Sequence, residues 1–164
     1  MSEFGPILDK LSGTRFKFQT ENQSNNDLYN EKQRRAEQLF ELSTGFKTVP
    51  ANAHGPSRLD GFIVKEKQFR AGYEIKCRTN TFEQLMKYGS FILTKDKVDS
   101  CMLVCSTLCI PFIAICYSIP DDEIRYWFVS DDRGFFYNQY KIVDTKLLGK
   151  PETVYQFPFN QSFQ

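Results

Sequence analysis

The sequence predicts an α/β fold in which a mixed β-sheet is flanked by α-helices. Three observations support this class: an amphipathic helix comes first, two strand candidates joined by a charged turn follow it, and a buried strand candidate comes after a further apolar helix. The 164 residues suffice for one compact domain and are too few for two ordinary ones. We therefore expect an N-terminal arm over residues 1–25 and a single domain over residues 26–164.

The first helix is expected to begin at Asn26 or Asp27, either of which can serve as its N-cap, and to end before Gly45. Apolar residues at helical spacing share one of its faces: Leu28, Tyr29, Ala36, Leu39 and Phe40. Residues 50–57, which contain two prolines and a glycine, are expected to form a loop.

Two later helices are expected. Asn80 can cap a short one, with Glu83 placed to complete a capping box, and Thr94 can cap the second. The second helix has a broad apolar stripe, formed by Val98, Cys101, Met102, Cys105, Leu108 and Cys109. It is therefore expected to be largely buried.

The strand candidates account for the sheet. Residues 59–64 and 73–77 flank a charged turn, residues 112–117 form an apolar central strand, and residues 124–129 form a strand antiparallel to it. The aromatic tail after Pro151 is expected to be an edge strand or a strap over the core.

The composition sets limits on partners and location. The chain has 16 Phe and 8 Tyr, which predict an aromatic core, and its formal net charge is only +1. An anion-binding surface must therefore be local. No stretch approaches the roughly 20 apolar residues that span a bilayer, and the first residues lack the basic and apolar regions of a signal peptide. No membrane partner is expected.

The five cysteines favour a reducing compartment, because their number is odd and four of them crowd into one apolar stretch. Cys101, Cys105 and Cys109 recur every four residues and would form one helix stripe. A soft-metal site is one interpretation, but the single histidine, His54, is far away and no CxxC occurs. Packing as small buried hydrophobes is the other, and we adopt it. A cytoplasmic location is expected.

The segment with chemical content is the predicted hairpin. Side chains alternate along a strand, so Glu74 and Lys76 emerge on one face while Ile75 points into the core. Asp60 begins the preceding strand, and antiparallel pairing can place its carboxylate next to Glu74. Two close carboxylates repel unless a cation lies between them, and oxygen ligands suit Mg²⁺. A neighbouring lysine can orient water or offset phosphate charge, so the set fits metal-assisted phosphodiester hydrolysis.

This spacing resembles the active-site motif of the PD-(D/E)XK nuclease superfamily. Asp60 matches the first acid, Glu74 and Lys76 match the E-x-K half, and Leu59 stands where the family often has proline. The resemblance covers roughly residues 28–119. It implies a restriction-endonuclease-like fold, a mixed sheet with flanking helices and with the two halves of the motif on adjacent strands.

The resemblance also implies roles for individual residues. Asp60, Glu74 and the Ile75 carbonyl would hold Mg²⁺ or Mn²⁺, and Lys76 would position the attacking water. Many members carry a further Glu on the preceding helix, here Glu31, Glu37 or Glu41. Glu37 is selected because it lies roughly 60° around the helix from Phe40, at the border of the buried stripe.

Several residues are expected to contact DNA. Basic side chains cluster in and around the charged turn, at Lys65, Lys67, Arg70, Lys76 and Arg78. Ser57 and Arg58 precede Asp60 on a loop that can touch a phosphate, and His54 can assist proton transfer. Gln84 and Tyr88 resemble the Q-x-x-x-Y motif of several exonuclease families. The alternative interpretations are a solvated turn and an ordinary amphipathic helix.

The function expected from these residues is that of a metal-dependent deoxyribonuclease of the endonuclease or junction-resolvase type. DNA is its expected partner, and a homodimer is expected because cutting two strands needs two sites. The small size and aromatic tail suggest a phage protein acting in the host cytoplasm. The alternatives are an exonuclease subtype and a non-catalytic nucleic-acid-binding or structural module, in which Glu74 and Lys76 form a surface ion pair and Asp60 is a turn residue.

Overall fold

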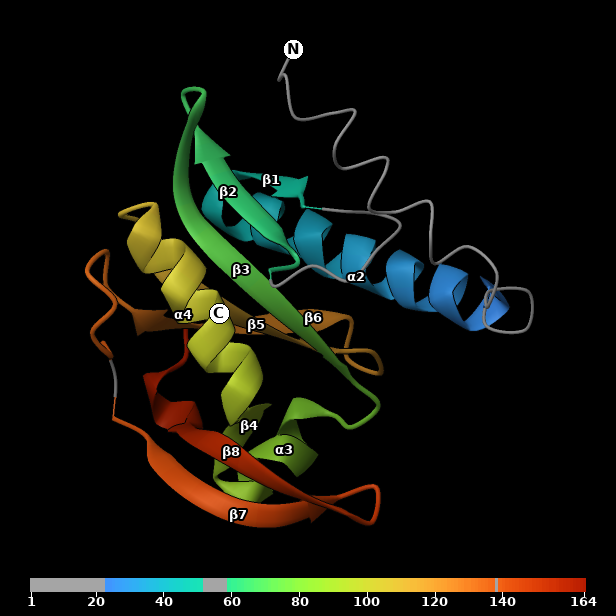
Figure 1. Cartoon of the computed structure of the whole chain (residues 1–164). Coiled ribbons are helices and arrows are strands. Elements are labelled where there is room, and N and C mark those ends of the chain that lie inside the picture. The colour runs from blue at the N-terminus through green and yellow to red at the C-terminus, as the bar shows by residue number, and fades with distance from the viewer. Residues whose placement is uncertain (1–22, 52–58, 138) are drawn as a thin grey trace.

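The computed structural model describes residues 23–51, 59–137 and 139–164, and Figure 1 labels its elements. Helix α2 (Gln23–Thr44) comes first. Gly45 ends it with a φ of 74° and an N–H that donates to the Glu41 carbonyl at 2.8 Å, which confirms the predicted C-terminal glycine. Residues 23–25 belong to this helix rather than to the predicted arm, and residues 1–22 of that arm lie outside the described part of the chain.

A five-stranded mixed sheet has the strand order β1-β2-β3-β5-β6. Its strands are β1 (Lys47–Pro50), β2 (Gly61–Lys65), β3 (Gln68–Arg78), β5 (Phe112–Ser118) and β6 (Glu123–Ser130). β3 and β5 run parallel, and the other neighbours run antiparallel. The predicted mixed sheet, its hairpin and the antiparallel β5–β6 pair are confirmed. β1 was not predicted, because it is short and mostly exposed.

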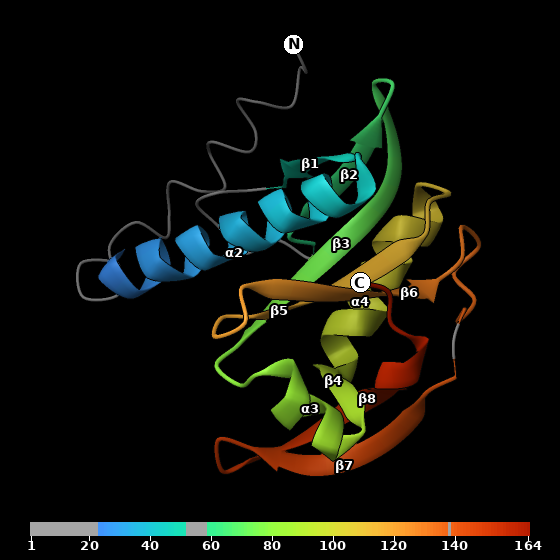
Figure 2. The same ribbon diagram turned by 180° about the vertical axis from the view of Figure 1, so that it is seen from behind.

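The two faces of this sheet carry different helices: α2 lies on one face and α4 (Lys95–Thr107) on the other (Figures 1 and 2). Tyr73 and Ile75 of β3 face α2 and join a buried cluster with Ala36 and Phe40. The α4 face holds a second buried cluster, which includes Cys101, Cys105, Phe112, Ala114, Cys116 and Trp127. Consecutive residues of β3 therefore belong to opposite layers.

A second sheet of three strands packs below the first in Figure 1, in the order β4-β8-β7. It consists of β4 (Ser90–Thr94), β7 (Lys141–Leu147) and β8 (Lys150–Pro158), and helix α3 (Phe82–Tyr88) precedes β4. The prediction that the tail is an edge strand is wrong, because β8 pairs with a neighbour on both sides. A 3₁₀ turn (Phe159–Gln161) follows, and Trp127 Nε1 donates to the Pro158 carbonyl at 3.0 Å.

The short helix α3 is capped one residue later than predicted. Thr81, which has extended backbone angles, accepts from the Gln84 N–H, and the Gln84 side chain accepts from the Thr81 N–H, so the capping box is Thr81–Gln84 rather than Asn80–Glu83. Thr94 precedes α4 as predicted, but its side chain makes no capping hydrogen bond.

The cysteine stripe is correct at two of its three positions. Cys101 and Cys105 are buried between α4 and the sheet, as is Cys116 on β5, and all are free thiols. Core packing of Cys109 was predicted wrongly: α4 ends at Thr107, and Cys109 follows it, exposed, with a φ of 54°. Among the described helices, none is long and apolar enough to cross a membrane.

Candidate active site

Asp60 stands immediately before β2 and is fixed against β3 by both its backbone and its side chain. Its N–H donates to the Tyr73 carbonyl at 3.0 Å, and its carboxylate Oδ2 accepts from the Ile75 N–H at 2.7 Å. Because alternate residues of a strand direct their backbone groups to the same side, the Ile75 carbonyl faces this edge as well. Asp60 thus lies beside Ile75, one residue from Glu74, as the antiparallel pairing predicted.

Gly61 allows this close approach. A Cβ at this position would overlap the Tyr73 hydroxyl and the Val49 carbonyl, so a side chain would push β2 away from both neighbours. The glycine that follows Asp60 is therefore needed where three strands meet.

Glu74 lies on the α4 face of β3 and is only 2% exposed. Lys76 Nζ is 3.1 Å from its Oε1, and Lys97 Nζ, from α4, is 3.2 Å from its Oε2. Oε2 is buried and is ion-paired with Lys97. The geometry places one buried carboxylate between two ammonium groups. Glu74 and Lys76 share a strand face, as predicted, and Ile75 is buried on the opposite one.

The pKa of Glu74 is raised to about 7, mainly because burial disfavours its charged form and secondly because Asp60 repels it. Lys76 and Lys97 act in the opposite direction, and their attraction only partly offsets the burial. Asp60 acts on Glu74 because it is hydrogen-bonded to Ile75, the next residue along β3. A carboxyl group that gives up its proton near neutral pH is suited to a site where a cation binds.

Glu37 reaches the same region from the other side of the sheet. It is buried on α2 and accepts a hydrogen bond from the Tyr73 hydroxyl at 2.7 Å. Burial raises its pKa, and the hydrogen bonds from Tyr73 and Gln33 lower it. The Tyr73 hydroxyl also lies against Gly61, the residue that follows Asp60, which brings Glu37 to the neighbourhood of Asp60. Asp60 thus lies between two buried glutamates, Glu37 on the α2 face and Glu74 on the α4 face.

The other two helix acids lie elsewhere. Glu41 Oε1 accepts from the N–H and hydroxyl of Thr48, both at 2.8 Å, so it ties α2 to β1. Glu31 is exposed. Of the three candidates, Glu37 is the one that is buried near Asp60, through its hydrogen bond with the Tyr73 hydroxyl.

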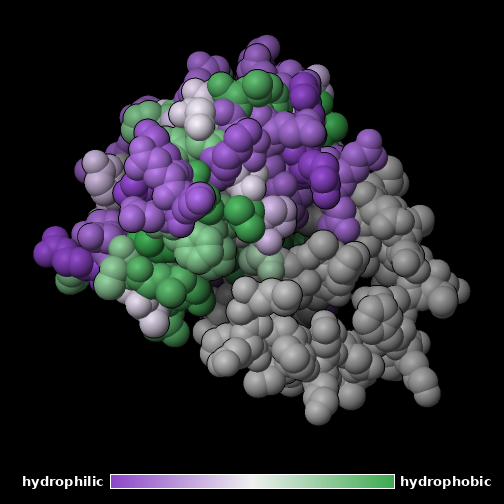
Figure 3. All heavy atoms as spheres, turned by 90° about the horizontal axis from the view of Figure 1, so that it is seen from above, coloured by the Kyte–Doolittle hydropathy of each residue, from purple (hydrophilic) through white to green (hydrophobic). Residues whose placement is uncertain are grey.

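The predicted DNA-contacting residues of the hairpin lie away from Glu74. Lys65, Lys67 and Arg70 are exposed near the tip, where Lys65 Nζ lies 5.1 Å from the Phe46 ring centre. At about 3.4 Å per residue along β3, Lys67 is roughly 24 Å from Glu74. Figure 3, viewed from above, shows a described surface that is mostly hydrophilic, with one hydrophobic patch toward the lower left and smaller ones elsewhere. The DNA contact predicted for these three residues stays a prediction, and it concerns DNA bound away from Glu74.

Arg78, Gln84 and Tyr88 are placed differently from the hairpin lysines. Arg78 donates to the Ile92 carbonyl at 3.2 Å and lies 5.8 Å from the Phe91 ring centre, so it joins the two sheets. The Gln84 side chain is used in the helix cap, whereas Tyr88 is 75% exposed at the end of α3. Tyr88 is therefore the freer of the pair to contact a ligand.

The loop residues Ser57, Arg58 and His54 lie outside the described part of the chain. Their predicted contacts with phosphate, and the proton transfer by His54, remain predictions.

Lys97 was missed by the sequence analysis. It comes from α4, whose contact with Glu74 depends on how the helix packs on the sheet. A signal was available: Lys97 directly precedes buried Val98 in a helix predicted to be largely buried, so its position lies close to the sheet. A glutamate buried on that same sheet face needs compensating charge.

The donors available for a metal are two carboxylates and one carbonyl. Among the described residues no group of three or more His, Cys, Asp or Glu side chains gathers as a metal site. Asp60, Glu74 and the Ile75 carbonyl nevertheless offer oxygen atoms next to one another in the sheet, with the Glu74 carboxylate held between two lysines. This set fits a hard divalent cation that retains several waters.

No family model, curated protein or solved structure matches the chain. Its α/β class, with a mixed sheet between helices, and the geometry around Glu74 are the grounds on which a function can be inferred.

Proposed function

We propose that the chain is a metal-dependent DNA nuclease that hydrolyses phosphodiester bonds through Asp60, Glu74 and Lys76. The observation that carries the proposal is the buried Glu74 carboxylate, which lies between Lys76 and Lys97 and within electrostatic reach of Asp60. Burying a charge cluster of this kind is costly even when its members are paired, so we take it as a sign of a functional site.

The roles follow from the positions of the groups. Asp60, Glu74 and the Ile75 carbonyl would hold Mg²⁺ or Mn²⁺. Such an ion, when bound, neutralises phosphate charge and makes water more acidic. Lys76 is positioned to orient the attacking water and to stabilise charge that develops on the phosphate. Glu37, held by the Tyr73 hydroxyl, acts as a positioning residue beside Asp60.

The arrangement of the strands supports the resemblance to the PD-(D/E)XK superfamily. A helix comes first, Asp60 immediately precedes β2, Glu74 lies on the antiparallel strand β3, and after further helices β5 pairs parallel to β3. We propose the restriction-endonuclease-like fold on this basis. An endonuclease or junction resolvase that cuts two strands needs two such sites, which a homodimer would supply.

One observation favours a second candidate, a non-catalytic nucleic-acid-binding or structural module. Glu74 is already flanked by two lysines, and a buried charged triad of this kind can be purely structural. The two candidates differ in what removal of the Lys76 charge does. A structural triad would lose stability, whereas a catalytic lysine would lose rate.

The test is a cleavage assay with purified protein on linear, circular and four-way-junction DNA, in Mg²⁺, Mn²⁺ or EDTA. We expect cleavage only with metal, and a rate lower by about 10²–10³-fold in Lys76→Met, with DNA affinity changed little. Lys47→Met, an exposed lysine paired with Glu41, is the matched control and should cut normally. If wild-type protein cuts no substrate with either metal, or Lys76→Met cuts normally, the non-catalytic module replaces the nuclease.

A further inference from the structure

Two neighbouring cavities lie beside the candidate active site, and because they share lining residues we treat them together as one groove. One, of about 750 Å³, lies between the end of α3 and the segment that leads into β7, and the other, of about 680 Å³, lies between the two sheets. They share Tyr88, Ser90 and Gln156, and the second also includes Lys76. The groove thus begins at the lysine of the proposed catalytic site and leads across the second sheet.

The charged side chains that line the groove are basic, and one of them, Lys76, is ion-paired with Glu74 behind it. Lys76 and Arg78 line its inner part and Lys141 its outer part, while none of the described lining residues is acidic. This local excess of positive charge occurs in a chain whose net charge is only +1. A phosphodiester backbone is the kind of ligand that such a path attracts.

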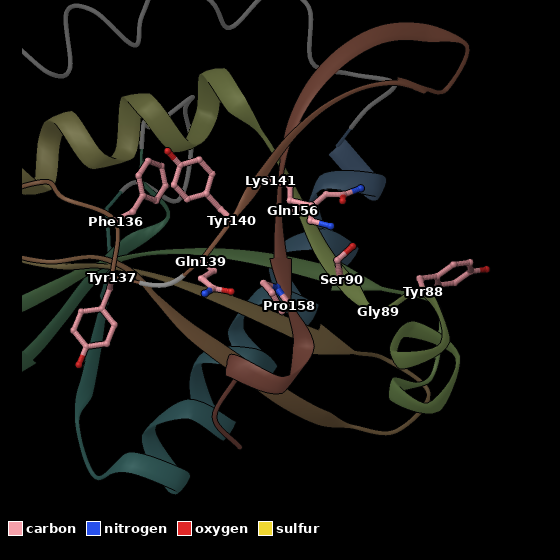
Figure 4. Close-up of a pocket in the computed structure, with 10 residues that line it drawn as sticks. All are labelled: Tyr88, Gly89, Ser90, Phe136, Tyr137, Gln139, Tyr140, Lys141, Gln156 and Pro158. Carbon is pink, nitrogen blue, oxygen red and sulfur yellow. The ribbon is translucent and has the colours of Figure 1, made fainter.

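Exposed aromatic rings stand at both ends of the outer cavity. Figure 4 shows Tyr88 at one end and Phe136, Tyr137 and Tyr140 at the other, with Ser90 and Gln156 between them. Tyr88 is 75% and Tyr137 67% exposed. Phe136 and Tyr140 pack together at 4.0 Å between ring centres and form a wall. Ring faces open to solvent are suited to stacking against planar groups.

The combination of cations, open rings and side-chain amides selects one class of ligand. Unpaired nucleotides present base faces that stack on tyrosines, edges that bond to amides such as Gln156, and phosphates that meet lysine and arginine. Bases in a duplex are stacked on each other and would not stack on the exposed rings of Tyr88 and Tyr137, the second of which also lies 5.9 Å from the Phe128 ring centre. We infer that this groove binds a single strand of DNA and leads it to Lys76. The inference rests on the proposed nuclease function and names its substrate class: DNA with an unpaired strand or end.

The test is equilibrium binding in EDTA, where cleavage plays no part. Fluorescence anisotropy of labelled oligothymidylate, and of a blunt duplex of equal length, is measured with the full chain and with Tyr88→Ala and Tyr137→Ala. Each variant should weaken single-strand binding roughly tenfold, the loss typical of one stacked base, and change duplex binding less than about twofold. Tyr88→Phe keeps the ring and should bind like wild type.

Phe135→Ala is the matched control. Phe135 is 66% exposed and lies two residues from Tyr137, but it lines neither cavity. It should leave both affinities unchanged. Melting temperatures of all variants should equal that of the wild type, so that a loss of binding cannot come from unfolding.

The inference is overturned if the tyrosine variants bind oligothymidylate as tightly as Phe135→Ala does, or if they lose duplex binding equally. Its failure is separable from failure of the nuclease proposal. If the protein cleaves DNA with metal but the tyrosine variants bind normally, only the inference about the groove is contradicted. If binding depends on the tyrosines but no DNA is cleaved, the groove inference stands and the nuclease proposal is contradicted.

Discussion

Glu74 combines deep burial with a pKa that reaches about 7, whereas an ordinary glutamate titrates near 4.5. Below pH 4.5 the carboxyl is protonated in both the folded and the unfolded chain. Between pH 4.5 and 7 the unfolded chain releases this proton while the folded chain retains it, so the contribution of Glu74 to stability falls as pH rises through this window. Asp60 adds to the shift, and Lys76 and Lys97 oppose it.

Glu74→Gln should remove this pH dependence. In EDTA the wild-type free energy of unfolding should fall by about 2 kcal/mol across the window, and the variant should lose much less. Urea denaturation at both ends of the window measures the difference. Parallel pH curves for the two proteins would show that Glu74 titrates normally and that its burial has been misjudged.

Asp60 and Glu74 should also make stability depend on divalent metal. A ligand that binds only the folded chain stabilises it by about 2.7 kcal/mol at a hundred times its Kd, so Mn²⁺ or Mg²⁺ should raise the melting temperature. Asp60→Ala with Glu74→Ala should abolish the rise. The control is Asp144→Asn, an exposed acid bonded to Thr153, which should keep it. An equal rise in the double variant would place the metal elsewhere.

At the scale of the element, charge reversal in the β2–β3 hairpin tests whether basic side chains far from Glu74 help to position DNA. Reversal of Lys65, Lys67 and Arg70 to Glu should weaken binding to all sequences and make the slope of log K against log salt less steep by about 3. The cleavage rate at saturating DNA should stay near wild type, because these residues lie far from Glu74. The control carries three reversals on and beside α2, at Lys32, Arg34 and Lys47. If both triples behave alike, the hairpin is merely solvated.

The turn of the same hairpin is strained. Glu66 and Lys67 have φ values of 52° and 62°, and Lys65 pairs with Gln68 across them, so both central residues adopt a conformation that favours Asn-Gly. Each left-handed residue costs roughly 1 kcal/mol. Glu66→Asn with Lys67→Gly should therefore raise the free energy of unfolding by about 1 kcal/mol in urea titration. A double alanine variant should give no gain, and an equal gain there would point to charge rather than backbone strain.

The second sheet shows where sequence patterns stop being informative. β7 is exposed on most of its residues and lacks the apolar alternation that marks a half-buried strand. β8 carries the apolar residues Val154, Tyr155 and Phe157, which indicated a strand but not its position in the middle of a sheet. Which neighbours a strand has depends on contacts far apart in sequence, here with β4 about sixty residues earlier. The strands of the first sheet were predictable because their pairing is local or their apolar run is continuous.

At the scale of the whole molecule, the site draws on three layers. Glu37 comes from the α2 layer, Asp60 from the sheet, and Lys97 from the α4 layer, while β3 supplies Glu74 and Lys76. The β3 part was predictable from strand alternation, and Glu37 from helix geometry together with the family resemblance. Lys97 was not, because its contact depends on the docking of α4. The groove between the two sheets was not predictable either, since the second sheet itself was unknown.

The most direct measurement of the central claim is the Mn²⁺ dependence of DNA cleavage by Glu74→Gln and Lys76→Met. Glu74→Gln weakens a metal ligand, so its cleavage should be nearly abolished in Mg²⁺ and partly restored by excess Mn²⁺. Lys76→Met retains the ligands and lacks the positioned charge, so excess Mn²⁺ should not restore it. Wild-type rates in either variant, or equal rescue of both, would contradict a metal held by Asp60 and Glu74 with Lys76 acting on the reacting groups.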